Sequence, residues 1–263
     1  MSIDADTKIK QEMLILESVN LGRTVQADIY LAGEMSGETS LLLINDGQDL
    51  ARMGFAGMLE GLRTEPLLCV GIHAGEQRMM EYGVAGRPDY LGRGVKAGDY
   101  ARFVLEELIP AIRQRYGARF REKAFAGFSL GALSALDIVW HYPKEFAKAG
   151  LFSGSFWWRT KDKSDPGYNE NTDRIMHDEV RKGGYHPWLK LYFECGTEDE
   201  AEDRNGNGII DSIDDTLDLI SELVKEGYDR TKDIRYVEIP GGHHDVETWA
   251  KAMPEFLLWG WGK

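Results

Sequence analysis

Short apolar runs recur along this chain and alternate with longer segments of helical period. Uninterrupted apolar runs are typical of strands buried on both faces of a parallel sheet. Two further extended segments, 11–18 and 24–32, come first and predict an antiparallel opening. We therefore predict a single α/β domain over 1–263, with a mostly parallel sheet covered by helices on both faces. The predicted parallel strands are Leu41 to Asn45, Leu67 to Ile72, Ala124 to Phe128, Ala149 to Phe152, Leu189 to Cys195 and Ile234 to Ile239.

One long segment, 156–188, lacks a clear period and lies between two predicted strands. It is rich in aromatic and charged residues. A connection of this length inside a compact domain usually has a functional role. We expect it to form a lid or a substrate wall.

A serine motif stands between a predicted strand and a predicted helix. The chain reads Gly127-Phe128-Ser129-Leu130-Gly131 at this point. In α/β hydrolases this pattern forms a sharp turn that presents a nucleophilic serine, and the following amide stabilises the oxyanion. The motif alone is short enough to arise by chance, and the alternative is a tight turn with an incidental serine. The strand–motif–helix context favours Ser129 as nucleophile and the Leu130 amide as oxyanion donor.

A serine nucleophile needs a base, and six histidines are available. In the α/β-hydrolase fold the order along the chain is serine, acid, histidine, with the histidine after the last strand. Only the pair His243 and His244 satisfies that order; the alternative is a polar loop without chemistry. The acid is expected after the preceding strand, where Glu198 and Asp199 both qualify by position.

These residues resemble the esterase family that includes enterochelin esterases, feruloyl esterases and S-formylglutathione hydrolases. The similarity extends over roughly 38–258. The resemblance implies the α/β-hydrolase fold, His244 as base, Asp199 as acid with Glu198 as second choice, and Gln48 as second oxyanion amide. His243 stands where the family usually has glycine. The segments that carry the resemblance are Asp46-Gly47-Gln48, 78–82 (RMMEY), 103–110 (FVLEELIP), Gly127 to Gly131, 153–158 (SGSFWW), Gly196 to Asp199, and His244-Asp245 with Trp249.

The segment 203–214 matches the template of a calcium-binding loop. Oxygen donors alternate along its first half, Gly208 permits the turn, and an aspartate replaces the usual final glutamate. We expect one structural Ca²⁺ ion here, and no organic cofactor; the alternative is an acidic surface turn. The expected ligands are Asp203, Asn205, Asn207, the Ile209 carbonyl, Asp211 and Asp214.

The predicted function is hydrolysis of a small-molecule carboxylic ester through an acyl-enzyme. An acyltransferase on the same scaffold and a non-catalytic binding module remain as alternatives. Trp157, Trp158 and Arg87 are expected to contact the substrate, although packing of the tryptophans and simple solvation of the arginine would explain them equally well.

The formal net charge of −13 argues against a nucleic-acid partner and against attraction to anionic lipid. The first residues, 1–13, lack the apolar core of a signal peptide. Cys69 and Cys195 lie in predicted strands and are expected to be thiols, with a disulfide as the alternative. We therefore expect a cytoplasmic location; the oligomeric state is left open.

Overall fold

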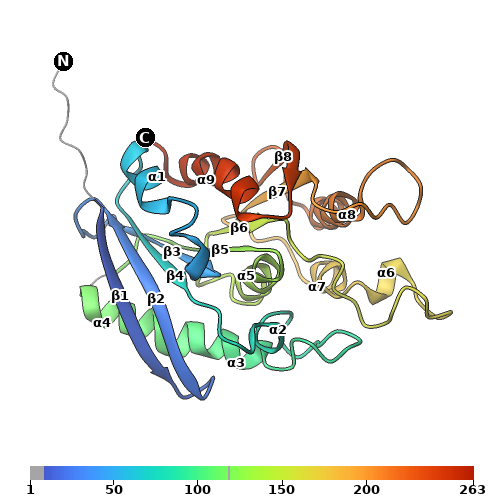
Figure 1. Ribbon diagram of the computed structural model, residues 1–263, viewed down its shortest axis with the longest axis horizontal. Helices are drawn as coiled ribbons and strands as arrows, with labels where there is room; N and C mark the ends of the chain where they lie inside the picture. Colours follow the sequence, from blue (N-terminus) through green and yellow to red (C-terminus); the bar gives the residue numbers. More distant parts are fainter. Residues whose placement is uncertain (1–8, 118) are drawn as a thin grey trace.

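The computed structural model describes residues 9–117 and 119–263 and is built around one sheet of eight strands (Figure 1). The strand order across the sheet is β1-β2-β4-β3-β5-β6-β7-β8. The strands are β1 (Lys10–Ser18), β2 (Arg23–Ala32), β3 (Ser40–Asn45), β4 (Leu67–Ile72), β5 (Lys123–Phe128), β6 (Lys148–Phe152), β7 (Lys190–Glu198) and β8 (Ile234–His243).

Only the beginning of the sheet is antiparallel. β1 pairs with β2, and β2 pairs with β4, in antiparallel registers. Each pair from β4 through β3, β5, β6 and β7 to β8 is parallel. The predicted α/β-hydrolase fold, with an antiparallel opening and a mostly parallel sheet, is therefore confirmed.

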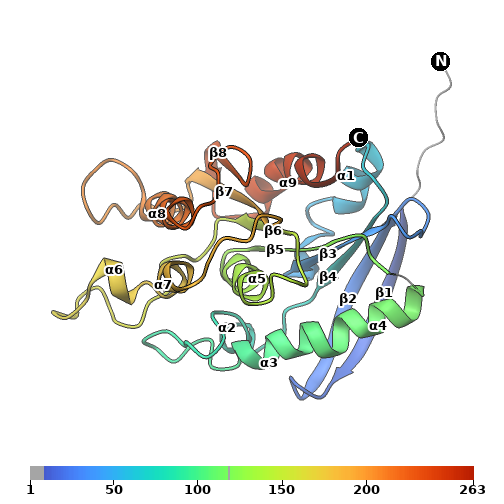
Figure 2. The ribbon, with the colours of Figure 1, turned by 180° about the vertical axis from the view of Figure 1, so that it is seen from behind.

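Helices cover both faces of the sheet, and the buried strands supply both interfaces. In β3, Leu41 and Leu43 face one apolar core while Leu42 and Ile44 face the other. The first core is closed by α3 (Ala97–Arg102), the π-helical turn η2 (Phe103–Leu108), α4 (Ile109–Tyr116), α5 (Leu130–His141), α7 (Ile175–Lys182) and α8 (Asp211–Lys225). The second is closed by α1 (Phe55–Gly61) and α9 (Val246–Trp261), on the opposite side of the sheet (Figure 2).

The segment 156–188 is more ordered than its sequence suggested. It contains α6 (Glu170–Asp173) and α7, and α7 packs Ile175, Met176 and Val180 into the first core. The half of the segment that contains α7 is therefore part of the packed domain. For this half, the prediction of a lid was wrong. α7 has only 8 residues, which is too short for its apolar face to stand out as a helical period.

Both cysteines are buried free thiols, as predicted. No helix among the described residues is long and apolar enough to cross a membrane. Residues 1–8, which make up most of the segment in which no signal peptide was found, lie outside the described part of the chain.

Candidate active site

Ser129 occupies a strained turn between β5 and α5. Its backbone lies at φ 56° and ψ −122°, a region that a residue with a side chain rarely adopts. The turn is possible because strand and helix approach very closely: a Cβ on Gly127 would lie 2.3 Å from the Gly131 carbonyl oxygen. Ser129 is half-buried, so the turn presents its hydroxyl at the surface of the domain. This is the geometry expected of a nucleophile elbow.

The elbow lies at the point where the order of strands reverses. β3 and β5 are neighbours, but the chain runs from β3 to β4 on the far side before it returns to β5. In open parallel sheets the crevice at such a reversal, beyond the carboxyl ends of the strands, is the usual ligand site. The Nδ2 group of Asn45, at the end of β3, donates to the Gly131 carbonyl oxygen over 2.7 Å and so fastens the end of β3 to the first turn of α5.

The two expected oxyanion donors both stand at helix starts beside this crevice. Leu130 is the first residue of α5, and Gln48 is the second residue of the 3₁₀ turn η1 (Gly47–Asp49). The first amides of a helix have no partner within the helix and face outward with the positive end of its dipole. Both amides are therefore available to a ligand.

An arginine that the sequence analysis did not single out lies behind the loop that contains Asp46 and Gln48. Arg78, at the start of α2 (Arg78–Glu81), donates Nε and Nη2 to the two carboxylate oxygens of Asp46 over 2.6 and 2.8 Å. Its Nη2 also lies 3.4 Å from the carbonyl oxygen of Phe128, next to the nucleophile. This pair fixes Asp46 in its left-handed conformation (φ 58°) and places a positive charge beside the site.

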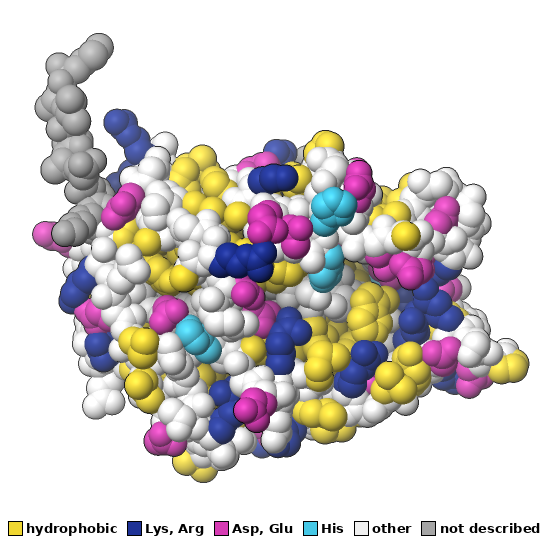
Figure 3. Space-filling model, in the orientation of Figure 1, with side chains coloured by type: hydrophobic (Ala, Val, Ile, Leu, Met, Phe, Trp, Pro, Cys, Tyr) yellow, Lys and Arg dark blue, Asp and Glu magenta, His cyan; other side chains and the backbone are white. Residues whose placement is uncertain are grey.

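The two histidines at the end of β8 have different neighbours. His243 shares a hydrogen bond of 3.1 Å between its Nδ1 and the carbonyl oxygen of Glu198, its register partner on β7. The Glu198 carboxylate lies 3.5 Å from His243 Nε2, and both side chains are largely exposed. Glu198 thus faces His243. On the face of Figure 3, two histidine side chains lie close together above a shallow hollow with hydrophobic side chains.

His244 is electrostatically linked to Asp199 instead. Neighbouring protein atoms desolvate part of its ring and lower its pKa, and the charge of Arg78 acts in the same direction; the charge of Asp199 opposes them. Burial raises the pKa of Asp199, whereas the Ser153 hydroxyl and the positive charge of His244 lower it. The structure therefore brings together His244 and Asp199, and leaves Glu198 to His243.

The three predicted catalytic residues are not joined by hydrogen bonds. Within the described residues, His244 bonds to neither Ser129 nor Asp199, and both Asp199 carboxylate oxygens lack a partner. The Ser129 hydroxyl lies 3.4 Å from the hydroxyl of Ser155, which the sequence analysis did not select. Catalytic hydrogen bonds are often loose in the absence of substrate and tighten in the complex.

Two of the three predicted substrate residues have other roles in the structure. Trp158 is fully buried, with its ring against Gly83 and Gly94, so the expectation that it contacts substrate was wrong. Arg87 was expected to meet an anionic substrate but lies 2.6 Å from Asp178 and 2.5 Å from Glu179 on α7. Those two carboxylates hold the guanidinium in a structural ion pair.

Trp157 remains a candidate substrate contact. It is half-buried, two residues beyond Ser155, and it lines a cavity of about 320 Å³. The Arg93 guanidinium lies over its ring at 5.1 Å and that of Arg159 at 5.8 Å. The same cavity is also lined by Tyr90, Lys163 and four carboxylates, those of Glu200, Glu202, Asp211 and Asp215. Its wall is therefore partly aromatic and carries charges of both signs.

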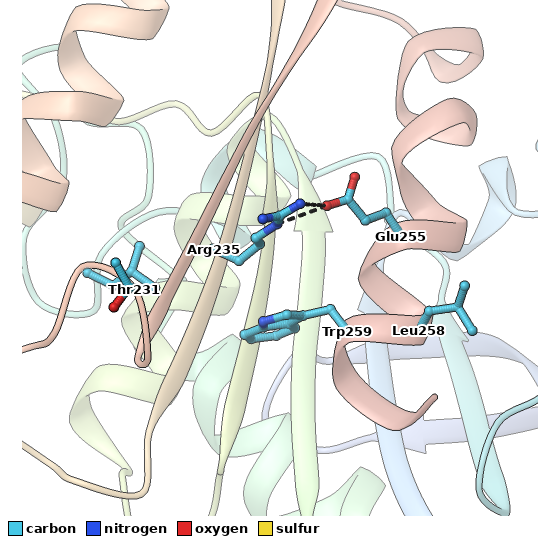
Figure 4. A pocket seen from close by; sticks show the side chains of 6 residues that line it. Thr231, Arg235, Glu255, Leu258 and Trp259 are labelled. Atoms are coloured by element: carbon cyan, nitrogen blue, oxygen red, sulfur yellow. Dashed lines mark hydrogen bonds and ion pairs between the residues drawn. The ribbon is translucent and has the colours of Figure 1, made fainter. Parts of the chain in front are cut away.

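A wider cavity of about 640 Å³ lies elsewhere, between the start of β8 and the end of α9. Arg235 and Glu255 are hydrogen-bonded across it over Trp259 (Figure 4). The predicted catalytic residues are absent from its walls. Its size does not make it the candidate active site.

The predicted calcium loop folds into a tight turn whose side chains converge only in part. Asp203 accepts hydrogen bonds from the amides of Gly206 and Gly208, each 2.8 Å long. The side-chain amides of Asn205 and Asn207 both donate to Asp214 Oδ2, over 2.8 and 2.9 Å. The amide of Ile209 donates to Asn207 Oδ1 over 2.7 Å.

Asp211, the remaining expected ligand, is engaged away from that group. Its carboxylate accepts from Lys163 Nζ over 2.6 Å and from the Arg204 amide over 2.8 Å. The first donor is a side chain outside the loop, which the loop template does not consider, and the second is a backbone amide within the loop. Among the described residues, no three His, Cys, Asp or Glu side chains form a metal-binding cluster. The side chains that gather around Asp214 are those of Asn205 and Asn207, which such a cluster does not count.

The chain is similar to several known proteins over most of its length. It is 23% identical to the uncharacterized protein YbbA of Bacillus subtilis (strain 168), over 87% of this chain and 88% of that protein. Its fold is similar to that of the enterobactin esterase FES from Shigella flexneri, with a TM-score of 0.73 and 19% identity over 95% of this chain. The chain spans only 58% of the length of that esterase.

A second structural relative matches end to end. The siderophore hydrolase EstA from Aspergillus nidulans superposes with a TM-score of 0.70 and 15% identity, over 98% of this chain and 96% of its own. The family model described as "Putative esterase" matches residues 18–259. That match includes the elbow, the acid and the histidine loop, and it shows that the chain belongs to this esterase family.

Proposed function

We propose that this member of the esterase family hydrolyses its ester with a triad of Ser129, His244 and Asp199, through a covalent acyl-enzyme. The backbone of Ser129 carries the proposal. A φ of 56° for a residue with a side chain is costly and persists only where the surroundings impose it. Here the close contact between Gly127 and Gly131 imposes it. The turn lies at the reversal in strand order, beside the Leu130 and Gln48 amides, which have no partner among the described residues.

The reaction follows from the roles that these groups can take. The Ser129 oxygen attacks the ester carbonyl while His244 accepts its proton, and the Leu130 and Gln48 amides donate to the oxyanion. The tetrahedral intermediate collapses as the C–O bond to the alcohol breaks, and His244 returns the proton to the leaving oxygen. Water, deprotonated by His244, then attacks the acyl-enzyme. The bond to the Ser129 oxygen breaks as His244 returns the proton to it, and the free acid leaves. Asp199 stabilises the imidazolium that forms during acylation and again during deacylation.

Trp157 supports an aromatic acyl group. It lies two residues beyond Ser155, whose hydroxyl is 3.4 Å from that of Ser129, and the guanidinium groups of Arg93 and Arg159 lie over its ring. Two fold relatives are described as acting on siderophores, one of them enterobactin. We propose an ester of a hydroxylated aromatic acid as the substrate class.

A panel of p-nitrophenyl, feruloyl and catecholate esters tests this proposal. We expect hydrolysis of the aromatic esters by the wild type and none by Ser129→Ala with an unchanged circular dichroism spectrum. Added acceptor alcohols would reveal an acyltransferase by the appearance of a new ester in place of free acid. Equal turnover by both proteins would contradict the role of Ser129. Substrate binding without turnover by the wild type would indicate a binding module.

We also propose that the 203–214 loop binds one structural Ca²⁺ ion. The turn around Asp203 and the approach of both asparagines to Asp214 support this proposal. Rotation of the two amides would turn their oxygens toward the ion. Asp211 would stay with Lys163 and Arg204, which leaves Asp203, Asn205, Asn207, the Ile209 carbonyl and Asp214 as ligands.

A further inference from the structure

A buried carboxyl group without a partner lies within the strand that leads to the triad acid. Glu194 on β7 is fully inaccessible to solvent, and neither of its carboxyl oxygens has a hydrogen-bond partner among the described residues. Along β7 its neighbour Tyr192 belongs to the core beneath α9, and the alternation of a strand places Glu194 on the same face. Its register partner on β6 is Phe152, in the same core.

Asp199, the residue just beyond β7, turns back toward this face. Its amide donates to the Gly196 carbonyl oxygen over 3.3 Å. The irregularity in the β7–β8 register lies on β8, where Ile239 and His243 pair with Gly196 and Glu198. A Cβ built on Gly196, which would point to the face of Glu194, lies 2.6 Å from Asp199 Oδ1. The carboxylate of Asp199 therefore folds back over Gly196, one side-chain position from Glu194.

Ser153 contacts the backbone of Glu194 and the side chain of Asp199. Its amide donates to the Glu194 carbonyl oxygen over 2.8 Å, and its hydroxyl is a contact that lowers the pKa of Asp199. Ser153 is itself held in a left-handed conformation, with φ at 45°. Trp249 on α9 fixes its hydroxyl by donating Nε1 over 2.9 Å.

Among the described residues, no cation faces Glu194 from the elements packed against it. From β6 it meets Phe152 and Ser153, and β8 places Val237 opposite. The nearby ionisable groups are Tyr192 and Cys195 on β7 and Asp199 just beyond it; burial keeps Tyr192 and Cys195 neutral by raising the pKa of each. From the histidine loop, His244 and Asp245 face Asp199.

Two neighbouring buried carboxylates cannot both ionise without a large cost, so such pairs hold a proton. Packing alone does not explain Glu194, because an apolar side chain would fill the space without an unpaired acid. We infer that Glu194 is a protonated positioning residue that donates its proton to a hydrogen bond with Asp199 through one buried water, and so keeps that carboxylate ionised toward His244. This inference rests on the proposed role of Asp199 as triad acid.

Two substitutions of Glu194 test the inference, because they separate its ability to donate a hydrogen bond from its ability to ionise. Glu194→Gln keeps the shape and a donor but cannot ionise, whereas Glu194→Leu removes both. We expect Glu194→Leu to lower kcat at least tenfold with KM within twofold, and Glu194→Gln to recover most of that loss. The matched control is Glu238→Gln, an exposed residue of β8, with kinetics like the wild type. Equal kcat values for the Gln and Leu variants would overturn the inference.

The pH profile provides a readout that a purely structural role would not change. Burial, followed by the charge of Asp199, raises the pKa of Glu194 to about 8. We expect an inflection in the wild-type kcat/KM profile near that pH as a second negative charge appears beside Asp199. The inflection should vanish in Glu194→Gln and persist in Glu238→Gln. Its persistence in Glu194→Gln would contradict the inference.

Infrared difference spectroscopy distinguishes failure of this inference from failure of the proposed function. At pH 6 the wild type minus Glu194→Gln spectrum should contain the carbonyl stretch of a protonated carboxylic acid. This band does not depend on catalysis, so it can be measured even if Ser129→Ala retains activity. Absence of the band would mean that Glu194 is ionised, whatever the fate of the triad.

Discussion

The ring of His244 meets the ring of Trp249 edge to face, with centroids 5.4 Å apart and an angle of 82° between the planes. Trp249 is buried, stacks on Phe128 just before the nucleophile at 5.0 Å, and donates to Ser153. One indole therefore touches the proposed base, supports the strand that ends at the proposed nucleophile, and orients the Ser153 hydroxyl beside the proposed acid, Asp199. The spacing of His244 and Trp249 in the sequence brings their two rings into contact.

We expect Trp249→Phe to lower kcat by about tenfold, because small displacements of a catalytic group cost one to two orders of magnitude. The phenyl ring keeps part of the support for His244 but loses the hydrogen bond to Ser153. Steady-state kinetics should show little change in KM. Trp188→Phe is a control on the surface, where the indole is 49% exposed. Equal kcat values for the two variants would contradict a positioning role.

Substitution of the two candidate acids should separate their roles. We expect Asp199→Asn to reduce kcat by about 10³- to 10⁴-fold, because the neutral amide cannot stabilise the imidazolium. Glu198→Gln should remain within twofold of the wild type, since Glu198 faces His243 at the exposed end of β7. The same kinetic assay reports both. A larger loss for Glu198→Gln than for Asp199→Asn would reverse the assignment.

The pH dependence should reflect the environment of His244. Desolvation and the charge of Arg78 lower the pKa of His244 below its usual 6.5, despite the opposing charge of Asp199. A general base acts only when it is neutral, so activity should persist to lower pH than an ordinary histidine would allow. The acid limb of the kcat/KM profile is expected below pH 6.5. An acid limb clearly above that pH would show that Asp199 dominates instead.

Much of the fold was predictable because the chain alternates in period, and much of the site was predictable because strand ends in a parallel sheet share one edge. The Gly127 to Gly131 turn and the His244 loop follow from those two rules. Periodicity could not show that Trp158 points inward while its neighbour Trp157 lies at the surface. It could not show either that Arg87 would meet Asp178 and Glu179, which lie about ninety residues away.

The residues that sequence reasoning missed act through contacts between distant segments. Ser155 becomes relevant only because β6 ends beside β5, and Glu194 only because Asp199 folds back over Gly196 on the same face of β7. A signal did exist for Glu194. A glutamate inside the otherwise apolar run Leu191 to Cys195 is unusual enough to mark a buried polar group.

The calcium loop predicts a metal-dependent stability. We expect calcium to raise the melting temperature and a chelator to lower it, since an ion that binds only the folded state stabilises it by mass action. Asp203→Asn combined with Asp214→Asn should abolish the difference. Asp218→Asn is a matched control in α8, outside the loop. Identical melting temperatures with calcium and with chelator would rule out the ion.

The central claim is that Ser129 is a nucleophile activated by His244. A fluorophosphonate reacts with such a serine and leaves a stable covalent adduct. Peptide mass spectrometry after labelling should find one phosphonyl group per chain, on the peptide that contains Ser129, with strongly reduced labelling in His244→Ala and none in Ser129→Ala. A folded wild-type protein that takes up no label, or one that carries it on another residue, would contradict the account.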